Sequence, residues 1–187
     1  MALWPPPRRV LIVAGVLIAA LALRVAEVEG TAYRPIIDAG TYLKLAAEVA
    51  HRGDYSTGHA AGVGAGGTRG PSAYFPPGFP YFLGAVDLLD GHPTRRDGAV
   101  QPARLSQAVL GTVTVGMVGL VALEAFGETT ALVAVVLAAI YPVLIELSGI
   151  LVAENLMTPL VLAAVWTMLR AGSGTDPPAP GSGASRR

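Results

Sequence analysis

Two acidic residues occupy positions from which a carboxylate could act on a substrate. Asp38 opens the stretch DAGTYLKLAAEVAHR, and Glu154 lies inside the apolar stretch SGILVAENL. A carboxylate can act as a general base toward a hydroxyl group, and two carboxylates together can hold a divalent cation. A charged side chain inside a bilayer costs about 3 kcal/mol, so an acidic residue in an apolar segment is a candidate functional residue.

The composition of the chain is typical of a membrane protein. Of its 187 residues, 52% are hydrophobic and 14% are charged, whereas a soluble domain carries about 25% charged residues. The formal net charge is zero, which argues against a nucleic-acid partner. Cysteine is absent, so disulfides and thiolate metal sites are excluded. We therefore expect an all-α integral membrane protein.

Four apolar segments are predicted to cross the bilayer, because each approaches the roughly 20 residues that a spanning helix needs. They cover residues 10–28, 104–126, 129–146 and 147–170. Arg8 and Arg9 directly precede the first segment and predict a cytoplasmic N-terminus, residues 1–9. Four crossings return the C-terminus, a disordered tail over 171–187, to the cytoplasmic side of a bacterial plasma membrane.

The first apolar segment has features with more than one interpretation. Arg8 and Arg9, followed by apolar residues and Ala20-Leu21-Ala22, also fit a cleavable signal peptide. Cleavage would leave the following loop on the same outer side. Arg24 and Glu27 lie three residues apart on the predicted helix, and pairing between them would explain both charges.

The long outer loop, residues 29–103, is expected to carry two short interfacial helices. In residues 38–52 apolar side chains recur with helical spacing, and Asp38 is of a type that caps helices. Residues 79–89 are apolar but too short to span a bilayer. An aromatic belt of the kind found at membrane interfaces surrounds this second helix. Its members are Tyr74, Phe75, Phe79, Tyr81 and Phe82.

Other polar residues are weaker candidates for catalysis or metal binding. His51, Asp54 and His59 match no metal-binding spacing, so exposed loop histidines are the favoured interpretation. Glu146 and Glu154 lie around the short outer turn between the last two predicted spans. The alternative for both is that they only mark the edge of that turn. The predicted topology places Glu154 on the same outer side as the loop helices.

The order of these segments resembles the N-terminal part of the C-type, polyprenyl-phosphate-dependent glycosyltransferases. These enzymes include bacterial relatives of protein O-mannosyltransferases and the aminoarabinose transferases of lipid A. The resemblance extends over residues 10–170. It rests on Arg24 at the outer end of the first span and on the stretches DAGTYLKLAAEVAHRGDY, FPPGFPYFLGAV, ARLSQAVLGTVTVGMVGLVALEAFG and AIYPVLIELSGILVAENLMTPL.

The resemblance implies transfer of a sugar from a polyprenyl-phosphate carrier to an acceptor hydroxyl of a protein, glycan or lipid on the outer face. It implies that Asp38 is the general base and that Glu154 is an acid that shapes the site, where a divalent metal stays an open option. The substrate-binding residues that it implies are Tyr42, Arg24, Arg104, Tyr74, Pro77 and Gly78. Ala39 stands where many members carry a second acid, so that acid's role is missing here.

The resemblance also bears on completeness. Members of this family have many more spans than four, so the chain is expected to be inactive alone or to need another chain that supplies further helices. The alternative is a non-catalytic four-span protein that acts as a scaffold or binds lipid carriers. In that case Asp38 and Glu154 would serve packing or topology, and amide replacements would be tolerated.

Overall fold

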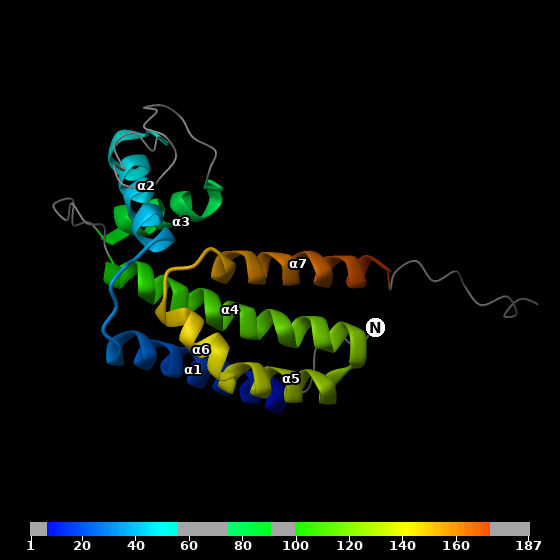
Figure 1. Cartoon of the computed structure of the whole chain (residues 1–187). Coiled ribbons are helices and arrows are strands. Elements are labelled where there is room, and N and C mark those ends of the chain that lie inside the picture. The colour runs from blue at the N-terminus through cyan, green and yellow to red at the C-terminus, as the bar shows by residue number, and fades with distance from the viewer. Residues whose placement is uncertain (1–6, 56–74, 91–99, 173–187) are drawn as a thin grey trace, which may run out of the picture.

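The computed structural model describes residues 7–55, 75–90 and 100–172, and every regular element in these ranges is an α-helix. The helices are α1 (Pro7–Gly30), α2 (Asp38–Arg52), α3 (Gly78–Asp90), α4 (Val100–Phe126), α5 (Glu128–Ile140), α6 (Pro142–Gly149) and α7 (Glu154–Gly172). Figure 1 shows the long helices side by side in a bundle, with α2 and α3 gathered at one end. The all-α class expected from the sequence is confirmed.

Within the described ranges, α1 and α4 are the two helices that are long and apolar enough to cross a membrane by themselves. Helices α5 and α6 meet at an angle of 50° and count as a third span if the bent pair is taken as one. Helix α7 has 19 residues and carries Glu154 and Arg170 at its ends, and it is not among these spans. A fourth crossing by α7 therefore stays a prediction.

The break at Pro142 changes the boundaries expected for the last two spans. The segment 129–146 divides into α5 and α6, and residues 147–149 belong to α6 instead of the next helix. Pro142 has no N–H group to donate to the carbonyl of Ala138, so α5 cannot continue through it. At the first position of α6 the missing N–H has no cost, because an N–H group there would have no partner within the helix. Residues 150–153 then form a non-helical connection, and α7 begins at Glu154.

Helix α4 is the centre of the bundle and packs against α1, α5, α6 and α7. Glycines on α4 allow close approach, which is common where helices pack in membranes. A Cβ atom at Gly111 would lie 2.9 Å from Nε of Arg24 and would overlap the hydroxyl of Ser148. Ala20 of α1 and Val115 of α4 are buried in one cluster with three residues of α5. Because Ala20 lies inside this cluster, α1 is an integral part of the packed bundle.

Polar contacts fix the directions of the helices. Arg9 and Glu128 form an ion pair between the first turns of α1 and α5, so these two helices begin at the same end of the bundle. At the other end, Arg104 near the start of α4 bonds to Thr31 just after α1. Helix α4 therefore runs antiparallel to α1 and α5.

A second core attaches α2 and α3 to the end of the bundle where α4 begins. Its buried residues are Ala39, Leu43 and Ala46 of α2, Phe79 and Leu83 of α3, Ala103 of α4, and Leu151 of the connection before α7. Gly84 lets α3 approach α2, since a Cβ atom there would lie 3.0 Å from the carbonyl oxygen of Ala46. Phe75 and Phe79 are buried in this packing, while Tyr81 is 52% exposed. Phe75 and Phe79 of the expected aromatic belt therefore help to join the two helices to each other.

Candidate functional site

Asp38 is the first residue of α2, and its side chain is exposed. The N-cap of α2 is Ile37, with φ 51°, and no side-chain hydrogen bond caps this end of the helix. The expectation that Asp38 caps α2 is therefore wrong. A negative charge in the first turn of a helix is favourable, and a carboxylate that makes no capping bond keeps its oxygens available to accept a proton from a substrate.

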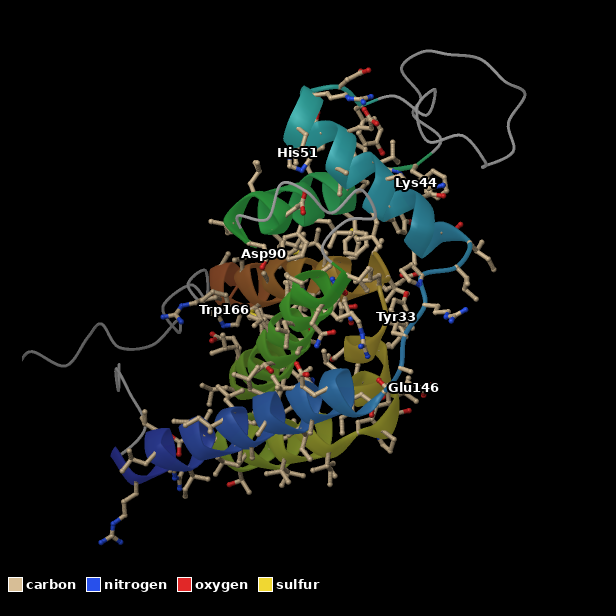
Figure 2. The ribbon with its side chains drawn as sticks, turned by 90° about the vertical axis from the view of Figure 1, so that its left-hand side faces the viewer. Tyr33, Lys44, His51, Asp90, Glu146 and Trp166 are labelled. Carbon is tan, nitrogen blue, oxygen red and sulfur yellow. The ribbon has the colours of Figure 1, made fainter. Side chains whose placement is uncertain are left out.

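Glu154 occupies the same position on α7 that Asp38 occupies on α2. It is the first residue of its helix, it is exposed, and it directly follows the connection 150–153. Glu146 is exposed on α6, and Figure 2 shows it at the end of the bundle where Tyr33 also lies. The structure thus gathers several acidic side chains at this end.

The phenol of Tyr42 connects the two proposed site carboxylates. Burial, followed by the negative charges of Asp38 and Glu154, raises the pKa of the Tyr42 hydroxyl. Both carboxylates must lie within electrostatic reach of this one hydroxyl group, because the effect of a charge on a pKa falls with distance. The ring of Tyr42 meets Phe75 and Phe79 edge to face, with centroid distances of 5.2 and 5.0 Å. Tyr42 packs against the same core as Ala153 and Leu156, the residues on either side of the Glu154 turn, and a site made of Asp38, Tyr42 and Glu154 stays a prediction.

Arg24 does not face this site. Its side chain is fully buried and donates hydrogen bonds to the carbonyl oxygens of Ala20 at 3.0 Å, Ala139 at 3.2 Å and Ala138 at 3.4 Å. Within the described residues it takes part in no ion pair, so the expected pairing with Glu27 is wrong. In this conformation the guanidinium contacts main-chain oxygens, although the resemblance implies that Arg24 contacts a substrate.

Arg104 is also buried, with 3% of its surface exposed. Its guanidinium donates to the carbonyl oxygens of Gly149 and Thr31 and to the Thr31 hydroxyl. The side chain therefore lies beneath the site and is committed to protein groups. Thr31 and Tyr33 could have been singled out from the sequence, because both are polar residues between the first apolar segment and Asp38.

The remaining substrate-binding residues implied by the resemblance lie at or just before the start of α3, which begins at Gly78. Pro77 and Gly78 are exposed, and the carbonyl of Pro77 accepts a hydrogen bond from the N–H of Tyr81 at 3.0 Å. The edge contact between Phe75 and Tyr42 brings this segment next to the site. Tyr74 lies outside the described residues.

Among the described residues, no group of three or more His, Asp and Glu side chains could hold a metal ion. His51 bridges α2 and α3 instead, with its Nε2 atom 2.8 Å from Oδ2 of Asp87. His59 of the loop lies outside the described residues. A metal at Glu154 stays a prediction.

The order of α3 to α7 also matches a known protein family. Residues 75–176 match the family model described as dolichyl-phosphate-mannose-protein mannosyltransferase. No curated protein and no solved structure matches the chain. The matched range begins with the stretch FPPGFPYF and includes Arg104 and Glu154, while Asp38 and Tyr42 precede it. Because this match covers more than half of the 187 residues, the chain belongs to the dolichyl-phosphate-mannose-protein mannosyltransferase family.

Proposed function

We propose that the protein transfers a sugar from a polyprenyl-phosphate carrier to an acceptor hydroxyl on the outer face of a bacterial plasma membrane. Family membership supports a membrane glycosyltransferase of the mannosyltransferase type. The observation that carries the finer proposal is the shared core at this end of the bundle, against which Tyr42 of α2 packs together with Ala153 and Leu156 beside Glu154. The raised pKa of Tyr42, caused by burial first and then by the charges of Asp38 and Glu154, agrees with this placement. One hydroxyl flanked by two exposed carboxylates is an arrangement that can receive both an acceptor and a proton.

The chemistry assigns a separate role to each residue. The Asp38 carboxylate takes the proton from the acceptor hydroxyl as the oxygen bonds to the anomeric carbon of the sugar. The bond between that carbon and the phosphate oxygen breaks, and its electron pair leaves with the polyprenyl phosphate. Tyr42 stays protonated because its pKa is raised, so its hydroxyl can donate a hydrogen bond to the substrate. Glu154 shapes the acceptor side of the site.

The carrier phosphate needs cationic partners, and the two buried arginines of α1 and α4 do not offer them in this conformation. Arg34 in the connection before α2 and Lys44 on α2 are exposed cations near Asp38 in the sequence, and Figure 2 shows Lys44 on α2. We propose that these side chains attract the phosphate. Additional helices, including those of another chain, would complete the binding site for the carrier.

The direct test is sugar transfer in membranes of the native cell with the wild-type chain replaced by Asp38→Asn. Mannosyl polyprenyl phosphate with a labelled sugar is the donor, and labelled acceptor is counted. We expect a loss of about 10²- to 10⁴-fold, the range that a general base contributes. Glu48→Gln is the matched control, because it removes another acid of α2, one that bonds to Arg52, and should leave transfer unchanged.

The alternative, a non-catalytic scaffold or lipid-carrier-binding protein, has one observation in its favour. Both carboxylates are first residues of helices, where a negative charge stabilises the helix without any chemistry. Equal transfer by wild-type protein and Asp38→Asn would remove the general-base assignment. Donor binding without transfer, unaffected by Asp38→Asn, would establish the lipid-carrier-binding alternative.

A further inference from the structure

We propose that Arg104 and Tyr33 are positioning residues that set the distance between the carboxylates of Asp38 and Glu154. Each carboxylate begins a helix that follows a short non-helical connection, residues 31–37 before α2 and residues 150–153 before α7. Tyr33 bonds the first connection to the second, and Arg104 bonds the first connection to Gly149, the residue directly before the second. The catalytic consequence rests on the function proposed above, whereas the geometric claim does not.

Arg104 provides the first tie between the connections. Its Nε donates to the carbonyl oxygen of Gly149 at 2.7 Å, on the side that leads to α7. Its two terminal nitrogens donate to Thr31, to the carbonyl oxygen at 3.2 Å and to the hydroxyl at 2.7 Å, on the side that leads to α2. One planar guanidinium thus joins the end of α6 to the residue that follows α1, and its fixed fork leaves little freedom between them.

Tyr33 provides a second and separate tie. Its hydroxyl accepts a hydrogen bond from the backbone N–H of Leu151 at 3.2 Å, so it also joins the two connections. The guanidinium carbon of Arg104 lies 5.1 Å from the centre of the Tyr33 ring, a cation–π contact. Leu151 is 2% exposed and packs in one cluster with Ala39 and Leu43 of α2. The tie therefore extends directly into the helix that Asp38 begins.

The charge of Arg104 has no acidic partner among the described residues. Its contacts are carbonyl oxygens, one hydroxyl and an aromatic face, while the carboxylate of Glu27 lies nearby beside Gly149 without forming an ion pair. Hydrogen bonds from a charged donor are the strong ones. A buried cation arranged in this way holds main-chain segments in place. The distance along the chain from each tie to its carboxylate is short, five residues from Tyr33 to Asp38 and three from Leu151 to Glu154. Loss of these hydrogen bonds should therefore change the positions of Asp38 and Glu154.

The chain contains no cysteine, so the distance can be measured directly on the full-length protein. The double variant Asp38→Cys with Glu154→Cys carries two spin labels, and the distribution of distances between them is recorded in membranes. We expect a single narrow distribution. Adding Arg104→Lys should broaden it, because an ammonium group cannot make the same forked contacts. Adding Arg52→Lys, an exposed arginine of α2, is the matched control and should not change it.

A second variant protects the test against simple misfolding. Tyr33→Phe keeps the ring beneath Arg104 and removes only the acceptor of the Leu151 N–H, so the fold should persist and the distribution should broaden less than with Arg104→Lys. An unchanged distribution in both Arg104→Lys and Tyr33→Phe would overturn the proposal. That result would leave the general-base assignment of Asp38 intact.

Kinetics separate positioning from direct binding of the donor. With the native carboxylates present, Arg104→Lys should lower kcat at least about 10-fold, since small misplacements of reacting groups have large effects on rate, and should leave KM for the donor unchanged. A raised donor KM with unchanged kcat would instead assign Arg104 to the carrier phosphate and overturn the positioning role. The distribution of distances could be narrow and broaden in the variants although the protein transfers no sugar. That result would support the positioning role of Arg104 and Tyr33 and would count only against the proposed function.

Discussion

Tyr42 is the residue at which the proposed site can be observed without any substrate. Its pKa is raised by burial first and then by the charges of Asp38 and Glu154. Asp38→Asn and Glu154→Gln should each lower this pKa part of the way, because a neighbouring negative charge disfavours tyrosinate while the burial remains. The ultraviolet absorbance of tyrosinate, followed as the pH rises, measures the change after subtraction of the Tyr42→Phe spectrum.

The same residue makes stability depend on alkaline pH. The pKa of Tyr42 is higher in the folded protein than in the unfolded chain, so its contribution is fully present below the ordinary tyrosine pKa and is lost as the pH rises through the raised value. Asp38→Asn should reduce this alkaline loss. Glu48→Gln on the same helix is the control. Unchanged titration in both single carboxylate variants would show that the three side chains do not share a site.

At the scale of the elements, the break between α5 and α6 depends on two residues far apart in the sequence. Pro142 cannot donate to the carbonyl of Ala138, and the buried guanidinium of Arg24 donates to that oxygen at 3.4 Å and to Ala139 at 3.2 Å. The cation lies at the C-terminal end of α5, where the helix dipole favours positive charge. Arg24 therefore replaces the hydrogen bond that the proline removes.

This arrangement predicts a coupling between the two positions. Arg24→Leu should destabilise the protein by about 1–3 kcal/mol, because a buried carbonyl loses its donor. Pro142→Ala restores an N–H group that can donate to the carbonyl of Ala138. In the Pro142→Ala background, Arg24→Leu should therefore lower the free energy of unfolding by about 1 kcal/mol less. Unfolding in detergent micelles measures the four proteins of the cycle. Pro159→Ala removes a buried proline of α7 and is the control, since its effect should add to that of Arg24→Leu. If the effects of Arg24→Leu and Pro142→Ala also simply add, the coupling is contradicted.

At the scale of the whole molecule, the parts that could be predicted from the sequence are those that depend on neighbouring residues. The helix over 38–52 follows from the spacing of its apolar side chains, and the break at Pro142 follows from a missing N–H. The contacts of Arg104 could not be predicted, since Thr31 and Gly149 meet it only when the ends of α1 and α6 come together at the start of α4. A pairing of Arg24 with Glu27 was expected because both lie on one helix. The carbonyl oxygens that Arg24 reaches belong mainly to α5 instead.

The same distinction applies to the number of crossings. Helices α1 and α4 qualify as spans by length and apolarity, while α7 owes its position to packing along α4. The parallel directions of α1 and α5 define the two ends of the bundle. Arg9 and Glu128 lie at one end, and Thr31 with the start of α4 lies at the other. Helix α7 begins beside Leu151 at the end where α4 begins and runs along α4 (Figure 1), so a crossing by α7 would return the chain to the side on which α1 begins.

Single cysteines in this cysteine-free chain test the whole arrangement. Arg8→Cys, Asp54→Cys and Ala171→Cys place thiols at exposed positions in the first turn of α1, after α2 and at the end of α7. With an impermeant maleimide on intact cells, we expect only the position after α2 to react, and the other two to react once the membrane is opened. Labelling of Ala171→Cys on intact cells would show that α7 does not cross. Labelling of Arg8→Cys instead of Asp54→Cys would place Asp38 and Glu154 on the cytoplasmic face, where transfer from an outward-facing carrier could not occur.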